Sequence, residues 1–85
     1  MSLNEVRIVP NPGNGAFSLD LMWDKDEQMN VVITDIAGQK VKEFIATTNK
    51  GQVTSIPVEL NVASGIYILT VTGSDSRYSA KVVVR

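Results

Sequence analysis

Hydrophobic and polar residues alternate in short segments along this chain, and turn-forming residues separate the segments. The clearest alternation covers residues 16–23, where Phe17, Leu19, Leu21 and Trp23 share one parity. Because successive side chains of a strand point to opposite sides of a sheet, these residues are predicted to face the core. No segment shows the apolar spacing of an amphipathic helix. The pattern therefore predicts an all-β fold.

Similar segments follow one another at intervals typical of a β-sandwich or barrel, and each ends at Gly, Asn, Asp or Pro. We predict about seven strands in two antiparallel sheets, an immunoglobulin-like sandwich, with a small β-barrel as the alternative. The other residues predicted to lie on the core faces are Val31, Ile33, Thr54, Ile56, Val58, Leu60, Tyr78, Ala80, Val82 and Val84.

Some of the predicted strands depart from simple alternation. In residues 40–47, Glu43 and Phe44 interrupt the pattern, which predicts a bulge or an edge strand. Pro57 cannot donate a ladder hydrogen bond, so its strand is also predicted at an edge. Residues 66–71 are apolar on both faces. Such a segment is typical of a strand buried between neighbours in the middle of a sheet.

A segment rich in turn-forming residues, 9–17, separates the first short strand from the clearest one. Pro10 and Pro12 fix the φ angle and lack a backbone donor, while Gly13 and Gly15 supply backbone freedom. None of these residues is chemically reactive. We interpret the segment as a turn that serves the fold.

Length and charge narrow the classes of function. The 85 residues suffice for one domain with a modest core, and no apolar run approaches the length of a membrane-spanning helix. Eight basic and nine acidic residues give a net charge of −1, which provides no general attraction for nucleic acid or anionic membranes. We predict no nucleic-acid partner, and we expect any partner to be recognised locally.

The chain contains neither Cys nor His. Their absence excludes disulfides, thiolate zinc sites and the usual hydrolytic triads. We expect no cofactor, no metal and no catalytic activity. Asp24 and Asp26 are separated by one residue, as in some calcium loops, but the Gly and distal Glu of such a loop are missing. A solvated turn is therefore the preferred interpretation.

Two further features allow a functional interpretation beside a structural one. Trp23, Tyr67 and Tyr78 could form an aromatic platform for sugars, as in a carbohydrate-binding or adhesion module, although all three fit the core pattern. Lys81 and Arg85 alternate with valines on the last predicted strand. They form either an ordinary exposed basic face or a contact for a receptor, and the residues alone leave both open.

Blocks of residues spread over the chain resemble one known family. They are Pro10-Asn11-Pro12 with Gly15-Ala16-Phe17, then Val31-x-Ile33-x-Asp35-x-x-Gly38-x-x-Val41, then Leu60 with Ser64-Gly65-Ile66-Tyr67, and finally Lys81-Val82-Val83. In this order and at these spacings they resemble the C-terminal sorting domain, type A, of the type IX secretion system of Bacteroidetes. The resemblance covers nearly the whole chain from Val9 onward.

The resemblance implies a non-catalytic targeting domain joined to an N-terminal cargo. In that family the cargo enters the periplasm by an ordinary signal peptide, and an outer-membrane translocon then recognises the folded domain. The cargo thus reaches the outer-membrane surface or the extracellular space, where a surface sortase-like protease commonly removes the domain. Residues 4–85 are expected to be the sorting domain, with the cleavage site near or upstream of Asn4. Residues 1–3 are expected to be a cloning scar, and a weak homodimer through edge strands is allowed.

The family associates its signal with the closing strand and the basic end of that strand. Carried over by position, the implied sorting-motif residues are Pro10, Asn11, Pro12, Gly15, Phe17, Asp35, Gly38, Gly65, Tyr67, Lys81, Val82, Val83 and Arg85.

Overall fold

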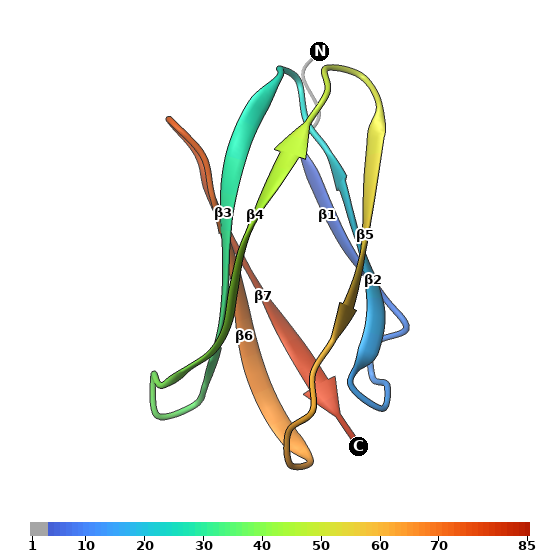
Figure 1. Ribbon diagram of the computed structural model, residues 1–85, viewed down its shortest axis with the longest axis vertical. Coiled ribbons are helices and arrows are strands. Elements are labelled where there is room, and N and C mark those ends of the chain that lie inside the picture. Colours follow the sequence, from blue (N-terminus) through green and yellow to red (C-terminus); the bar gives the residue numbers. More distant parts are fainter. Residues whose placement is uncertain (1–3) are drawn as a thin grey trace.

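Seven strands in two facing sheets form the fold, which a computed structural model describes for residues 4–85 (Figure 1). One sheet has the strand order β1-β2-β5 and the other β4-β3-β6-β7, and all the paired strands are antiparallel. Residues 1–3, the expected cloning scar, lie outside the described residues. The strands are β1 (Glu5–Val9), β2 (Ala16–Met22), β3 (Glu27–Asp35), β4 (Lys40–Thr48), β5 (Val53–Glu59), β6 (Gly65–Thr72) and β7 (Arg77–Val84).

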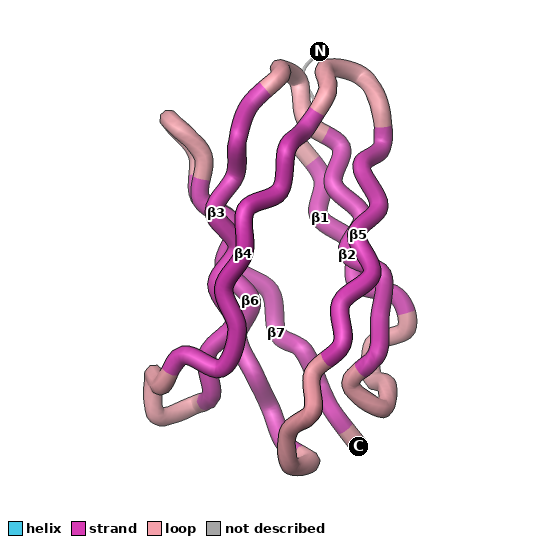
Figure 2. Tube along the Cα trace, in the orientation of Figure 1, coloured by secondary structure: helices cyan, strands magenta, loops and turns pink. Residues whose placement is uncertain are grey.

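Strands and the loops between them account for all the described residues, and no helix occurs among them (Figure 2). This part of the chain accordingly has no helix able to cross a membrane. The predicted all-β sandwich is confirmed, and the barrel alternative is wrong, because the two sheets stay separate.

The core lies between the sheets and consists of the inward side chains of the alternating strands. Phe17, Leu19, Leu21 and Trp23 of the first sheet are buried, as predicted. Burying a large apolar side chain stabilises a fold by about 1.5–3 kcal/mol, so these residues dominate the stability of a small domain. The largest fully buried side chains are Trp23, Leu19, Leu21, Met29, Ile33, Leu69, Val31, Val71 and Thr48.

Strand β6 lies in the middle of its sheet, as predicted, but it is buried on one face only. Tyr67, Leu69 and Val71 point into the core, whereas Ile66 is 46% exposed and Ile68 is half-buried on the outer face. Apolar residues on both faces of this strand therefore accompany a place inside the sheet, as predicted, without burial of both faces. Nothing among residues 4–85 forms a third layer over the outer face of this sheet.

Strands β4 and β5 are edge strands, as their irregular patterns predict. The register between β3 and β4 shifts at Ile33 and Thr34, which pair with Lys42 and Lys40. Val41 is the extra residue of this bulge, so a bulge and an edge position occur together. In β5, Pro57 lies on an edge strand. Its lack of a backbone donor therefore breaks no hydrogen bond between strands.

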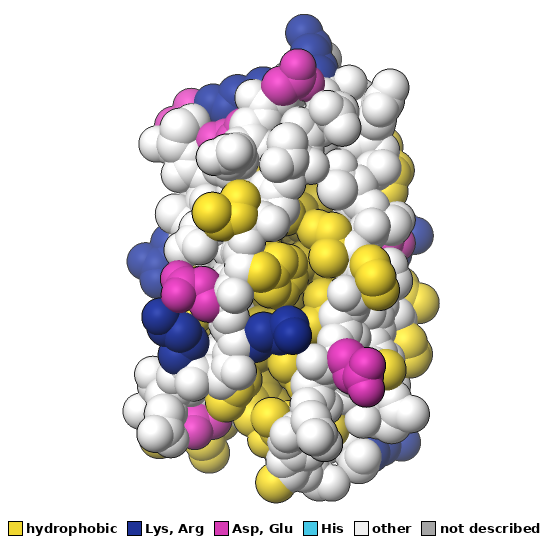
Figure 3. All heavy atoms as spheres, viewed as in Figure 1, with side chains coloured by type: hydrophobic (Ala, Val, Ile, Leu, Met, Phe, Trp, Pro, Cys, Tyr) yellow, Lys and Arg dark blue, Asp and Glu magenta, His cyan; other side chains and the backbone are white. Residues whose placement is uncertain are grey.

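On one side of the sandwich the hydrophobic core reaches the surface. Figure 3 shows hydrophobic side chains gathered in a band between β4 and β5, which are edges of different sheets. Phe44 of β4 and Ile56 of β5 are partly buried and pack against the core. Lys42 shares the inward parity of Phe44 and is half-buried. An inward charge on an edge strand discourages pairing with another chain.

Candidate recognition site on the terminal strand

The segment between β1 and β2 lies against the outer edge of β7, although the two are far apart in the sequence (Figure 1). The side chain of Asn11 makes the contacts that a neighbouring strand would make. Its Nδ2 donates to the carbonyl oxygen of Lys81 over 2.8 Å, and its Oδ1 accepts from the backbone nitrogen of Val83 at 2.9 Å. Asn11 therefore takes the place of a missing strand beside β7.

Gly13 continues this edge with its backbone. Its nitrogen donates to the carbonyl oxygen of Val83 over 3.0 Å, and its carbonyl oxygen accepts from the nitrogen of Arg85 at 2.8 Å. Gly13 forms a bridge to Val84, whose partner on the other side is Gly65 of β6. We term residues 11–13 the strap, because they are hydrogen-bonded to residues 81–85 along the edge of β7 that does not face β6.

Side chains in this half of β7 are divided between the core and the surface. Val82 and Val84 point inward and are buried. Lys81 and Arg85 are exposed, and Val83 is half-buried on the outer face. The inward valines thus fix the strand, while the other three residues are available to a partner.

Pro10 and Pro12 flank Asn11, and both are exposed. The peptide bonds that precede the two prolines are cis. Their rings lie outside the core, so they contribute to the surface around the strap. The structure therefore brings one subset of the predicted motif together: Pro10, Asn11, Pro12, Lys81, Val82, Val83 and Arg85.

Asp35 and Gly38, also in the predicted motif, form the hairpin turn between β3 and β4. Oδ1 of Asp35 accepts from the nitrogens of Ala37 and Gln39 at 3.0 and 2.9 Å, and the carbonyl oxygen of Asp35 accepts from the nitrogen of Gly38 at 3.0 Å. Gly38 has a φ of +87°, a conformation that favours glycine. The spacing of these two residues is explained by the turn.

Three other motif residues also serve the fold. The hydroxyl of Tyr67 donates to the carbonyl oxygen of Ala63 at 2.6 Å, an arrangement known as a tyrosine corner in immunoglobulin-like sandwiches. Phe17 is a core residue. The carbonyl oxygen of Gly15 accepts from the nitrogen of Leu60 at 2.8 Å and joins the start of β2 to the end of β5. The contacts of these residues are therefore accounted for by the fold.

Gly13 and Arg77 belong to this region but not to the predicted motif, and Gly65 belongs to the motif without a clear structural role. The sequence predicted only a turn at Gly13, although the backbone of this residue pairs with β7. Arg77 shares the outward parity of Lys81 and Arg85, so the alternation along the last strand could have identified it. Gly65 pairs with Val84, and a Cβ there would meet only the Tyr67 ring, 4.0 Å away. Space does not require glycine at position 65.

The aromatic residues considered for a sugar platform do not share a surface. Trp23 and Tyr67 are buried, in agreement with the core interpretation. Tyr78 is 40% exposed, so its predicted place in the core is wrong. It lies at the start of β7, where the β6–β7 hairpin stands away from the three-stranded sheet (Figure 1). A single partly exposed tyrosine does not make a stacking platform.

The acidic turn before β3 is tied to its neighbouring loops. A carboxylate oxygen of Glu27 accepts a hydrogen bond from the backbone nitrogen of Ser74, and this bond lowers the pKa of Glu27. Lys25 forms a 3.0 Å ion pair with Asp75 in the same loop as Ser74. Within the part of the chain that the structure describes, no three metal-binding side chains gather at one place. The arrangement supports the interpretation as a turn.

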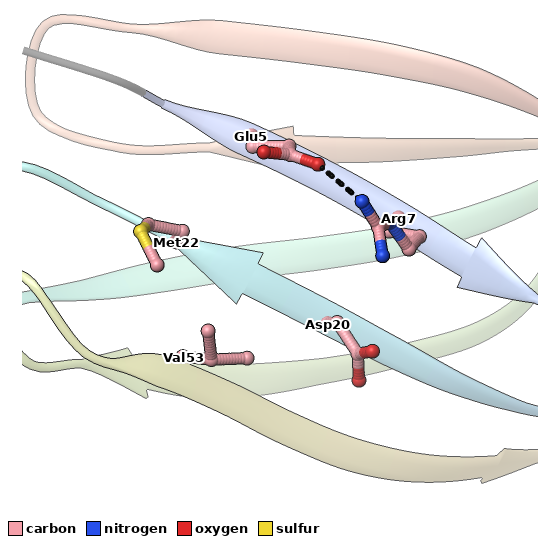
Figure 4. A pocket seen from close by; sticks show the side chains of 5 residues that line it. All are labelled: Glu5, Arg7, Asp20, Met22 and Val53. Atoms are coloured by element: carbon pink, nitrogen blue, oxygen red, sulfur yellow. Dashed lines mark hydrogen bonds and ion pairs between the residues drawn. The ribbon is translucent and has the colours of Figure 1, made fainter.

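A shallow hollow on the outer face of the three-stranded sheet contains further charged groups (Figure 4). Arg7 forms an ion pair with Glu5 on the same strand at 3.0 Å. The hydroxyl of Ser18 donates to Asp20 and lowers the pKa of that carboxyl, which keeps it ionised. A general acid needs a raised pKa instead. The hollow has a volume of about 180 Å³ and is lined by Glu5, Arg7, Asp20, Met22 and Val53.

Replacing Asn11 with alanine should loosen the terminal strand. We expect the free energy of unfolding to fall by about 1–2 kcal/mol, because two hydrogen bonds to β7 are lost at an exposed position. Native-state hydrogen exchange should show faster exchange at the amide of Val83 than in the parent protein. The amide of Val82, a residue that pairs with β6, should change less.

The matched control for Asn11 is Asn14→Ala in the same loop. Asn14 accepts only a local hydrogen bond from the nitrogen of Ala16, so its loss should leave exchange at Val83 unchanged. Equal exchange at Val83 in both variants would show that the Asn11 side chain does not hold β7.

Comparison with known proteins identifies the family. A search of curated proteins finds no match to the chain. The sequence model of a family described as the secretion system C-terminal sorting domain matches residues 7–85. The match runs from within β1 to the end of the chain and includes the strap and all of β7. The chain belongs to this family, whose members are sorting signals for type IX secretion.

Proposed function

We propose that this domain acts as the export signal of an N-terminal cargo without catalysing a reaction, and that the translocon of the outer membrane recognises it at β7 and the strap. The cargo enters through the periplasm and is delivered to the cell surface or the extracellular space. A sortase-like protease on the surface then removes the domain near or before Asn4. In this proposal residues 4–85 form the sorting domain.

One observation supports the terminal strand as the recognised element. The strap is hydrogen-bonded to residues 81–85 along the edge of β7 that does not face β6. On the inward face of the same segment, Val82 and Val84 are buried in the core. The backbone of Lys81, Val83 and Arg85 is consequently held in place, and their side chains lie on the outer face. A backbone that is already ordered loses little conformational freedom when it is bound, which favours recognition of the folded domain.

The proposal is tested by fusing residues 4–85 to a periplasmic reporter in a host with a type IX secretion system. The fusion should appear on the cell surface or in the medium, and deletion of residues 81–85 should leave the reporter in the periplasm. Retention of the intact fusion in the periplasm would overturn the proposed function.

Deleting residues 81–85 also removes two core valines, so a second variant separates recognition from folding. Lys81→Ala with Val83→Ala changes only outward side chains of β7 and should reduce export. Arg7→Ala with Met22→Ala is the matched control, since it removes one cation and one half-buried apolar side chain from the outer face of the other sheet. Equal export of the two double variants, with the intact fusion exported, would reject β7 as the recognised strand.

A further inference from the structure

The outer face of β7 displays a row of cations. Arg77, Lys81 and Arg85 are exposed and share the outward parity of this strand. Residues four positions apart along a strand are about 13 Å apart, so the three charges are evenly spaced along one line. Neither β7 nor the paired strand β6 contains an Asp or Glu, and the strap residues are also uncharged.

No acidic side chain neutralises this row. The ion pairs within residues 4–85 join Arg7 to Glu5, Lys25 to Asp75 and Lys40 to Glu43. The residues across from the row on β6 are uncharged, since Lys81 pairs with Ile68 and Arg77 with Thr72. The row is therefore a local positive field on a chain whose net charge is −1.

A hollow of about 500 Å³ lies beside the row on the same face of the four-stranded sheet. Its lining includes Val32, Ile68 and Thr70, Arg77 of the row, and Asp35, whose carboxylate accepts hydrogen bonds within the β3–β4 turn. This face thus offers apolar and hydroxyl-bearing surface next to a line of cations. The edge of β7 along residues 81–85 is already occupied by the strap, so a partner contacts this half of the strand through its outer face.

The geometry points to an extended, acidic segment of a protein partner as the ligand of this face. Rising by about 3.3 Å per residue, such a segment brings an Asp or Glu at every fourth position opposite each cation of β7. Apolar side chains between these acids, on the same side of the segment, reach the hollow near Ile68. A single row of cations beside an apolar floor suits a polypeptide better than the clustered phosphates of a lipid surface. This inference rests on the proposed function, because it gives the chemistry of the translocon component that binds the sorting domain.

The test uses the acidic peptide ETVTETVTE and its neutral counterpart QTVTQTVTQ with the whole chain. The acidic peptide should shift the amide NMR signals of β7 and of the β6 residues whose side chains lie on the outer face. Its affinity should fall as the salt concentration rises. The neutral peptide should bind about tenfold more weakly, since exposed ion pairs each contribute little and three act together. A similar tenfold loss of affinity for the acidic peptide is expected when Arg77, Lys81 and Arg85 are all changed to Gln.

In a control variant, Arg7, Lys25 and Lys50 are changed to Gln, which removes the same number of positive charges outside the row. This variant should bind the acidic peptide as the parent does. Both variants should keep the parent midpoint of urea unfolding within the error of the measurement. Equal binding by the two variants, or no binding by the parent, would overturn the inference. Binding to anionic phospholipid vesicles that depends on the row, without binding to the peptide, would overturn it too.

The reporter fusion separates this inference from the proposed function. If the intact fusion is exported and the Arg77, Lys81 and Arg85 variant is exported equally well, the acidic-partner inference fails and the sorting function stands. If the intact fusion stays in the periplasm, the sorting function itself fails. Loss of export in this variant, with normal export of the Arg7, Lys25 and Lys50 control, supports both.

Discussion

Replacing Gly15 with alanine is expected to lower the free energy of unfolding by about 3 kcal/mol, a large effect for the addition of one methyl group. Gly15 has a φ of +102°, which L side chains rarely adopt. A Cβ at this position would lie 2.5 Å from the carbonyl oxygen of Leu60, a contact that real Cβ atoms do not make. The backbone must therefore shift at the junction where Gly15 and Leu60 join β2 to β5.

Gly38 provides the matched control for this prediction. Its φ is also positive, at +87°, but no atom lies within 4 Å of a Cβ built there. Gly38→Ala should cost about 1 kcal/mol, from backbone strain alone. Urea unfolding followed by the fluorescence of buried Trp23 measures both variants. Equal losses in the two variants would mean that contact with Leu60 is unimportant.

Replacing Leu69 with alanine should lower the free energy of unfolding by about 3 kcal/mol. Leu69 is fully buried in the central strand β6, so the substitution leaves a cavity between the sheets. A domain of this kind has a total stability of about 5–15 kcal/mol, and the loss is a large part of it. The shift in the urea midpoint, at an unchanged dependence on urea, is the measurement.

Ile66→Ala in the same strand tests whether β6 is buried on one face only. Ile66 is 46% exposed on the outer face, so its truncation should cost about 1 kcal/mol or less. Should Ile66→Ala destabilise the domain as strongly as Leu69→Ala, another layer must cover this face in solution.

The alternation of residues was sufficient to predict the strands and most of the core. In β2 each inward side chain is large and apolar, whereas the outward face includes the polar Ser18 and Asp20, so the buried face can be read from the sequence. In β6 both faces are apolar, and the sequence cannot distinguish a second covering layer from an exposed apolar face. The inward parity of Tyr78 was clear, but its exposure depends on how far the opposite sheet extends, which is a property of the assembled fold.

The candidate site was predicted in part. Asn11 and Pro12 of the strap and most of residues 81–85 were identified, but their contact was not, because Asn11 is separated from Lys81 by 70 positions. A side-chain amide that pairs with a strand leaves no periodic signal in a sequence. Within the same motif, Asp35, Gly38 and Tyr67 have hydrogen bonds that account for their residue types, so the likeness to a family did not separate structural from exposed residues.

The strap joins two parts of the chain that a ribosome makes at different times. Residues 11–13 emerge with the first strand, and their partners, residues 81–85, emerge after every other strand has been made. Neither part can form the site alone, and a chain that stops early or folds incompletely lacks it. If the proposed receptor binds β7 in its strapped form, it therefore binds only domains that are finished and folded.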